Sequence, residues 1–225
     1  MAWKLRPAVD ADGLAIGRIG REAFLESGFG RILFTPRSDD EEPADPEEEI
    51  QWRRRRAIRR MNEGIPTLVV VDEAPGDNGE ETVLGFAQWE RPATSLPPVA
   101  AGAVPQASIA TEGQKADDPP KSLNLDKMQH MFKVFDEEIE KVLGPDGHKN
   151  MWYLMLLAVD PKYQGRGVGK TLLRWGMDQA AAEGKKTFLL ATVEGRPLYE
   201  KQGFRVLSDF EVYGTVNYAM LLGDL

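Results

Sequence analysis

The sequence predicts a mixed α/β fold, expected as a single domain over residues 1–225. A chain of 225 residues, 42% of them apolar, has enough hydrophobic side chains for one substantial core. Apolar residues at helical spacing alternate along the chain with short β-branched runs, which is typical of a sheet packed against helices. No internal repeat is visible, so we do not expect a repeat array.

The first half of the chain is expected to supply three strands and two helices. The strands are placed by β-branched and aromatic runs and the helices by apolar periodicity. The strands are expected at 3–6, 67–71 and 82–89, and the helices at 14–24 and 48–62. Residues 26–47, rich in glycine, proline and acids, are expected to form a long loop.

An insertion and an extra helix are expected in the middle of the chain. Residues 92–120 are rich in alanine, proline, serine and glycine without a period, which indicates a flexible surface segment. The helix follows at about 123–143, and its apolar face includes Met128, Met131 and Ile139. Methionines at this spacing usually pack in a core, although they can also line an adaptable apolar pocket.

The last third of the chain is expected to supply four strands and two helices. The strands are expected at 151–159, 187–193, 204–213 and 215–222, and the helices at 168–183 and 197–203. The apolar run at 151–159 is too short to cross a bilayer and is typical of a buried central strand.

Composition excludes several classes of site. The chain has no cysteine, which excludes disulfides, thiolate metal sites and a cysteine nucleophile, and we expect a cytoplasmic protein. His130 and His148 are its two histidines, so no metal cofactor is expected. The N-terminal residues lack an apolar segment, and no run approaches the length of a membrane span, so no membrane association is expected.

The net charge of −8 arises from one acidic segment. Residues 39–49 hold eight acids and no base, and the 28 acids left outside it equal the 28 bases. A neutral remainder argues against nucleic-acid binding. The segment could attract a cationic small molecule, or it could be a solvated loop. The helix at 48–62 carries six arginines, which we interpret as a solvated face paired with these acids.

A glycine-rich turn between the strand at 151–159 and the helix at 168–183 predicts an anion site. Gly165, Gly167 and Gly169 allow the backbone to approach an oxyanion, and the first amides of a helix point towards it. A plain tight turn is the alternative interpretation.

Two nucleotide-binding patterns fail at this turn. Gly169-Lys170-Thr171 matches the end of a P-loop, but Gln164 stands where the first glycine of that motif belongs. The dinucleotide pattern fails because Lys170 occupies the position of its third glycine. A degenerate P-loop hydrolase is kept as a minor alternative, with ATP–magnesium binding as its signature.

A third pattern fits completely. The run from Gln164 to Gly169 matches Gln/Arg-x-x-Gly-x-Gly/Ala, the acyl-CoA pyrophosphate loop of the GCN5-related N-acetyltransferase (GNAT) family. The run from Leu157 to Pro161 resembles that family's central strand and its exit, and Leu198 to Phe204 resembles its Leu-Tyr-Glu-Lys-x-Gly-Phe segment. The chain resembles in particular uncharacterised fungal members that act on small molecules.

The resemblance implies a mostly antiparallel sheet that is splayed at a site for acetyl-CoA, the co-substrate. In this family the backbone of the central strand pairs with the pantetheine, which implies Leu157, Ala158 and Val159 here. The pyrophosphate is expected on the loop and first helical turn, with Arg166 and Lys170 as possible charge partners. This expected set comprises Gln164, Gly165, Arg166, Gly167, Val168, Gly169, Lys170 and Thr171.

The resemblance also implies catalytic residues. Tyr199 matches the family's general-acid tyrosine, which protonates the departing thiolate, although a tyrosine packed against strand ends is the alternative. Glu194, just past a strand end, could act as the base, with Asp160 as a second candidate and no dedicated base as a third reading. Trp89 could line the acceptor pocket or pack in the core.

The expected reaction is acetyl transfer to an amine of a small molecule by direct attack in a ternary complex. Without cysteine, a cysteine acyl-enzyme is excluded. The expected partners are acetyl-CoA and the amine, with no nucleic acid and no membrane, in a monomer or homodimer. A catalytically inactive acyl-CoA-binding module and a protein-lysine acetyltransferase are the alternatives.

Overall fold

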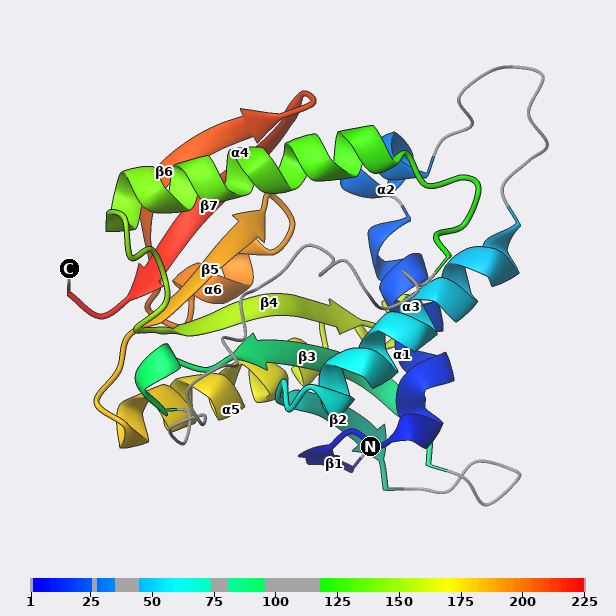
Figure 1. The fold of residues 1–225 in the computed structure, drawn as a ribbon. Coiled ribbons are helices and arrows are strands. Elements are labelled where there is room, and N and C mark those ends of the chain that lie inside the picture. The colour runs from blue at the N-terminus through cyan, green and yellow to red at the C-terminus, as the bar shows by residue number, and fades with distance from the viewer. Residues whose placement is uncertain (1, 26–27, 35–44, 74–80, 96–117, 225) are drawn as a thin grey trace, which may run out of the picture.

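The computed structural model describes residues 2–25, 28–34, 45–73, 81–95 and 118–224, and these form a mixed α/β fold. One seven-stranded sheet has the order β1-β2-β3-β4-β5-β7-β6 (Figure 1). Its strands are β1 (Trp3–Pro7), β2 (Thr67–Asp72), β3 (Val83–Glu90), β4 (Trp152–Val159), β5 (Thr187–Thr192), β6 (Arg205–Val212) and β7 (Thr215–Leu222). All neighbouring pairs are antiparallel except β4 and β5, which are parallel.

Helices cover both faces of this sheet (Figure 1). They are α1 (Gly13–Phe24), α2 (Gly28–Leu33), α3 (Pro46–Asn62), α4 (Leu125–Leu143), α5 (Val168–Ala182) and α6 (Arg196–Glu200). Helices α5 and α6 pack on one face, whereas α1, α3 and α4 lie on the other. Within the described ranges, no helix is both long and apolar enough to cross a membrane.

The expected loop at 26–47 is wrong for part of its length, because α2 forms there. Glycines at 28 and 30 made a loop the natural prediction, yet tertiary packing overrides their low helix propensity. The Phe29 ring meets the Phe135 ring of α4 edge-on at 5.8 Å, and Leu33 is buried. Helix α3 also begins earlier than expected, since Asp45 caps its first turn and Pro46 occupies the first helical position.

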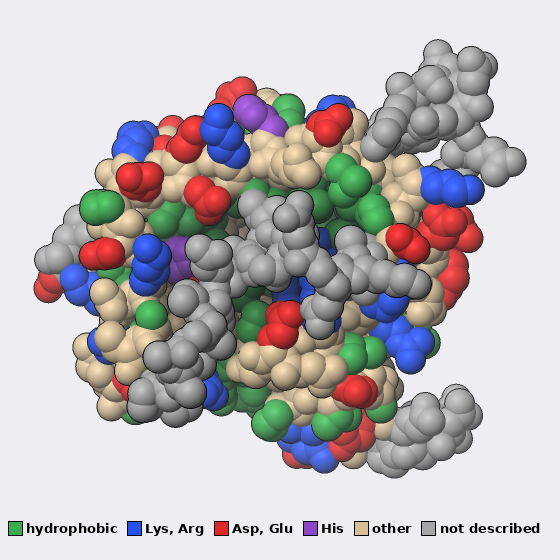
Figure 2. Space-filling view, viewed as in Figure 1, with side chains coloured by type: hydrophobic (Ala, Val, Ile, Leu, Met, Phe, Trp, Pro, Cys, Tyr) green, Lys and Arg blue, Asp and Glu red, His purple; other side chains and the backbone are tan. Residues whose placement is uncertain are grey.

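Helix α4 confirms the helix expected at 123–143 and the core interpretation of its methionine face. Met131 and Ile139 are buried, while acidic and basic side chains cover the outer face of the helix (Figure 2). Asn124 caps its start by accepting a hydrogen bond from the Lys127 amide at 3.0 Å. Most of the insertion expected at 92–120 lies outside the described residues.

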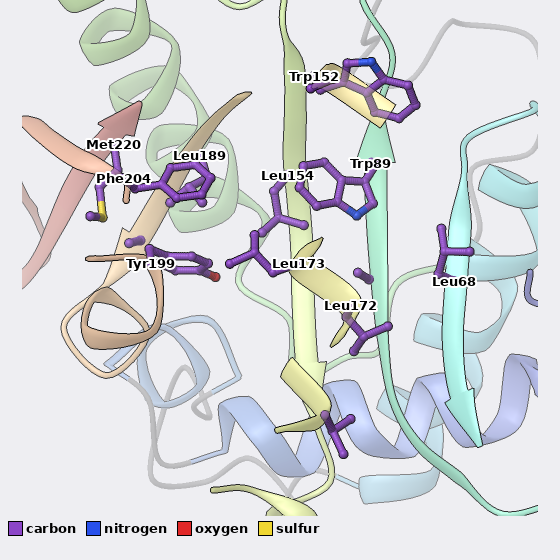
Figure 3. Packing of buried hydrophobic residues seen from close by; sticks show 14 of the residues in the cluster. Leu68, Trp89, Trp152, Leu154, Leu172, Leu173, Leu189, Tyr199, Phe204 and Met220 are labelled. Atoms are coloured by element: carbon purple, nitrogen blue, oxygen red, sulfur yellow. The ribbon is translucent and has the colours of Figure 1, made fainter. Parts of the chain in front are cut away.

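The main core lies between the sheet and α5. Leu172 and Leu173 of this helix are fully buried against Trp89, Trp152 and the residues around them (Figure 3). The helix approaches β3 closely because one of its core positions is a glycine. A methyl group at Gly176 would lie 2.3 Å from Cε2 of the Trp89 ring. This contact sets the distance between α5 and the sheet, and therefore the position of the start of α5.

We predict that Gly176→Ala lowers the free energy of unfolding by about 2 kcal/mol. The added methyl group overpacks the core, because the buried Trp89 ring cannot move away from it. Urea denaturation measures the change. The control is Asp178→Ala on the exposed face of the same helix, expected to stay within about 0.5 kcal/mol of the parent. Equal stability of the two variants would contradict this account of the packing.

Candidate functional site

Strands β4 and β5 separate part-way along their length. Their last paired residues are Leu154 and Leu189, whereas β4 stays paired with β3 as far as Val159. The register between β3 and β4 shifts at Met155, the extra residue between Leu154 and Leu156. Such a bulge bends a strand and increases its twist, which explains why β4 diverges here. The backbone of β4 beyond the bulge therefore borders an opening in the sheet.

The N–H and C=O groups of successive β4 residues point alternately towards β3 and towards the opening. The amide of Asp160, just after the strand, donates to the carbonyl of Leu84 in β3 at 2.9 Å. Since hydrogen-bonding groups of successive residues point to opposite sides, the groups of Ala158 also face β3. Those of Leu157 and Val159 face the opening. The geometry thus narrows the three predicted backbone contacts to these two.

The glycine-rich turn follows β4 at the mouth of the opening. Gly165 and Gly167 have φ angles of +72° and +100°, a conformation that side chains disfavour, so glycine is required at both. The Gln164 side chain donates to the Val159 carbonyl at 3.2 Å and ties the turn to the end of the strand. The two glycines and this hydrogen bond hold the turn against the exit of β4.

Helix α5 directs its free amides towards the same place. Its first hydrogen bond joins the Thr171 amide to the Gly167 carbonyl at 3.0 Å, so the amides of Val168, Gly169 and Lys170 have no carbonyl partner within the helix. A side chain at Gly169 would contact Leu198 of α6 at 3.3 Å, so glycine allows the helix start to lie close to β4 and α6. The turn and the helix start together form a candidate anion site beside the opening.

Positive side chains surround this anion site. Lys162, Arg166 and Lys170 are all exposed around the turn. The Arg166 guanidinium lies over the Tyr163 ring, 5.5 Å from its centre. These charges add to the positive end of the α5 dipole, so the site suits a doubly charged pyrophosphate group.

Tyr199 lies on α6 at the other border of the opening. Its ring packs edge-on against Phe204 at 6.0 Å, and its hydroxyl points away from Phe204 towards Leu173 (Figure 3). Among the described residues the hydroxyl has no hydrogen-bond partner. Burial raises the pKa of Tyr199 well above its ordinary value, because the phenolate would lose its hydration. The phenol therefore stays protonated and can serve as a proton donor.

The other expected residues have different surroundings. Glu194 is exposed on the turn after β5, before α6. Asp160 is buried and accepts a hydrogen bond from the Lys162 amide at 2.9 Å, with Arg18 at 3.8 Å, which is the geometry of a turn residue. Trp89 is fully buried in the core, so the reading that placed it in an acceptor pocket is wrong.

The acids upstream of α3 are used within the fold. Asp45 caps the helix, and Glu49 is buried between Arg53 at 2.8 Å and Arg21 at 3.4 Å. Carboxylates in a first helical turn are stabilised by the helix dipole, so Glu47 and Glu48 also have a structural role. Residues 39–44 of the acidic segment lie outside the described residues. Within the described part of the segment, 45–49, nothing indicates a site for a cation.

Sequence reasoning missed a polar group on the face opposite α5. Arg60 donates to the side-chain oxygen of Gln88 on β3 at 2.6 Å, so the solvated-face interpretation is wrong for this arginine. Nearby on β4, the Tyr153 ring lies 4.2 Å from the His148 ring. Helical periodicity could have placed Arg60 on the inner face of α3, three residues from buried Ala57, but six arginines together obscured it.

Comparison with known proteins agrees with this geometry. Residues 130–206 match the family model described as an acetyltransferase (GNAT) domain. The resemblance to the GNAT family is confirmed. Among the described ranges, no cluster of three or more His, Asp or Glu side chains could hold a metal ion.

Solved structures show the GNAT fold over nearly the whole chain. A Corynebacterium glutamicum protein, described as histone acetyltransferase HPA2 and related acetyltransferase, is 21% identical with a TM-score of 0.57, covering 98% of this chain and 96% of its own. The putative acetyltransferase yncA of Salmonella typhimurium, solved with acetyl-CoA, is 18% identical with a TM-score of 0.51, covering 99% and 94%.

A third structure with a similar fold was solved with coenzyme A. The paia N-acetyltransferase of Thermoplasma acidophilum, in complex with coenzyme A, is 16% identical with a TM-score of 0.51, and both chains are covered to 98%. At these identities the likeness establishes the fold. The narrower resemblance to fungal members stays a prediction.

We predict that Gly167→Ala weakens acetyl-CoA binding by at least about tenfold, because an alanine at φ +100° displaces the amides at the start of α5. Isothermal titration calorimetry measures the dissociation constant. Gly184→Ala is the matched control, since this glycine also has a positive φ, +62°, but lies after the opposite end of α5. Equal affinities for the two variants would remove the turn from the binding site.

Proposed function

We propose that the protein transfers the acetyl group of acetyl-CoA to the amine of a small molecule. The opening between β4 and β5, with the free amides of α5 at its mouth, is the observation that carries this proposal. The opening offers unpaired strand backbone to an extended chain with amide groups, and the helix start offers an anion site to its charged end. Pantetheine linked to a pyrophosphate has both features in this order.

In the proposed complex, pantetheine lies along β4 as an added half-strand. Backbone groups of Leu157 and Val159 pair with its amides, and the pyrophosphate rests on the segment from Gln164 to Thr171. Two acetyltransferases of similar fold, solved with acetyl-CoA or coenzyme A, support this choice of co-substrate. The thioester then lies near the bulge of β4, where a backbone N–H can donate to its carbonyl oxygen.

The proposed chemistry is a direct attack. The neutral amine nitrogen attacks the thioester carbon, the carbon–sulfur bond breaks, and Tyr199 gives its phenolic proton to the departing sulfur. The amine loses one proton as the amide forms, so acetyl-CoA and amine yield an N-acetyl product and CoA. Glu194 is the proposed acceptor of that proton, through water, because it is exposed beside the opening while Asp160 is committed to its turn.

Two experiments in sequence test the proposal. Acetyl-CoA at about 100 times its dissociation constant should stabilise the protein by about 2.7 kcal/mol, seen as a thermal shift of several degrees, whereas ATP–magnesium should cause none. A thiol-release assay against small amines and a lysine peptide then follows, free of background from protein cysteines. A shift without CoA release from any amine would instead favour an inactive acyl-CoA-binding module, and release with the peptide alone a protein-lysine acetyltransferase.

We predict that Tyr199→Phe lowers kcat on the order of tenfold or more while the affinity for acetyl-CoA is unchanged. The ring remains, so packing against Phe204 is kept and the proton donor alone is lost. Steady-state kinetics and calorimetry give the two values. Tyr213→Phe, at the tip of the β6–β7 hairpin, is the control and should keep full turnover. Unchanged turnover in Tyr199→Phe would reduce this residue to packing.

A further inference from the structure

Arg60 presents a fixed positive charge on the face of the sheet opposite α5. It comes from the last turn of α3 and donates to the Gln88 side chain at 2.6 Å. Gln88 is itself buried and donates to the Thr67 hydroxyl at 3.4 Å, so the acceptor oxygen cannot turn away. Burial lowers the pKa of Arg60, yet a guanidinium stays charged at any working pH.

No carboxylate among the described residues pairs with this charge. The acids nearest along the chain and the sheet have other partners: Glu63 is paired with Arg59 at 3.7 Å, and Glu90 lies 3.5 Å from His148. A part-buried cation without a counter-ion is costly, and a neutral amide oxygen compensates only part of that cost. The arrangement therefore leaves the guanidinium able to bind an anion.

Tyr153 adds a second donor on the same face. Its ring is held between Phe188, stacked at 6.0 Å, and His148 at 4.2 Å. Burial raises the pKa of Tyr153, with smaller contributions from the carboxylates of Glu90 and Asp136, so its hydroxyl stays protonated. In the described part of the chain that hydroxyl has no hydrogen-bond partner. Arg60 and Tyr153 interact electrostatically across this face, which brings a guanidinium and a neutral phenol together as donors for a carboxylate.

This donor pair lies next to the place where β4 leaves β5. Gln88 is opposite Leu156, the first β4 residue after the bulge, and Tyr153 precedes Leu156 by three residues, or about 10 Å of strand. Gln88 alternates with core residues Ala87 and Trp89, so its side chain is on the face away from α5. The donor pair is therefore beside the opening, on the face of the sheet opposite α5.

We propose that the acceptor is an amine that also bears a carboxylate, which Arg60 and Tyr153 bind while the amine reaches the thioester. This inference rests on the proposed acetyl transfer and assigns the substrate class of that same site. It differs from the cationic acceptor that the acidic segment had raised, since Asp45 and Glu49 are used within the fold. A guanidinium with a phenol distinguishes a carboxylate from the neutral amide of the same shape.

The experiment compares free α-amino acids and β-alanine with their carboxamides in the thiol-release assay. The parent protein should acetylate the free acids with a kcat/KM at least about tenfold above that of the matched amides. Arg60→Gln should abolish this preference through the KM for the acid, while leaving the calorimetric affinity for acetyl-CoA unchanged. Arg54→Gln, exposed on the same helix and bonded to Gln51, is the matched control and should keep the preference.

Each outcome has a distinct meaning. Equal or faster acetylation of the amides by the parent protein would overturn the carboxylate inference and leave the acetyltransferase proposal standing. A uniform loss of activity on acids and amides in Arg60→Gln would make Arg60 a residue that only fixes α3 to β3, and would also overturn it. An absence of CoA release with every amine, despite acetyl-CoA binding, would overturn the acetyl transfer itself.

Discussion

The incomplete pairing of β4 with β5 is the constraint on which the candidate site depends. Backbone N–H and C=O groups within a sheet need partners, and β4 loses them on one side after Leu154 while keeping β3 on the other. A strand in this state is a template for an extended chain with amide groups. The bulge at Met155 creates it, because one extra residue turns β4 away from its parallel neighbour.

Helix α5 places the candidate anion site at the end of this template. Its closeness to the sheet depends on Gly176 against Trp89, and the exposure of its first amides depends on the left-handed Gly167. Core packing and the chemistry of the site are therefore coupled through one helix. The same sheet separates the two proposed ligands, with the phosphate-binding helix on one face and Arg60 and Tyr153 on the other.

The charged side chains near the site show why local sequence is a poor guide to the substrate that accepts the acetyl group. Eight acids within residues 39–49 are the most visible electrostatic feature of the sequence, yet the described ones cap and stabilise α3. One arginine among six, Arg60, occupies the face beside the opening, and helical periodicity is the one local signal that points to it. Burial and partners, which arise from contacts between α3 and β3, decide which charge is available to a ligand.

The sequence by itself determined the seven strands and the α-helices other than α2, and it located the candidate anion site. Strand and helix periods are local, and the turn from Gln164 to Gly169 combines a φ requirement with a helix start, both of which are encoded within a few residues. Only the tertiary structure decided that α2 is a helix, that Trp89 is core, and that Ala158 faces β3 while Leu157 faces the opening. These outcomes depend on packing and strand pairing between segments far apart in the chain, which no local pattern contains.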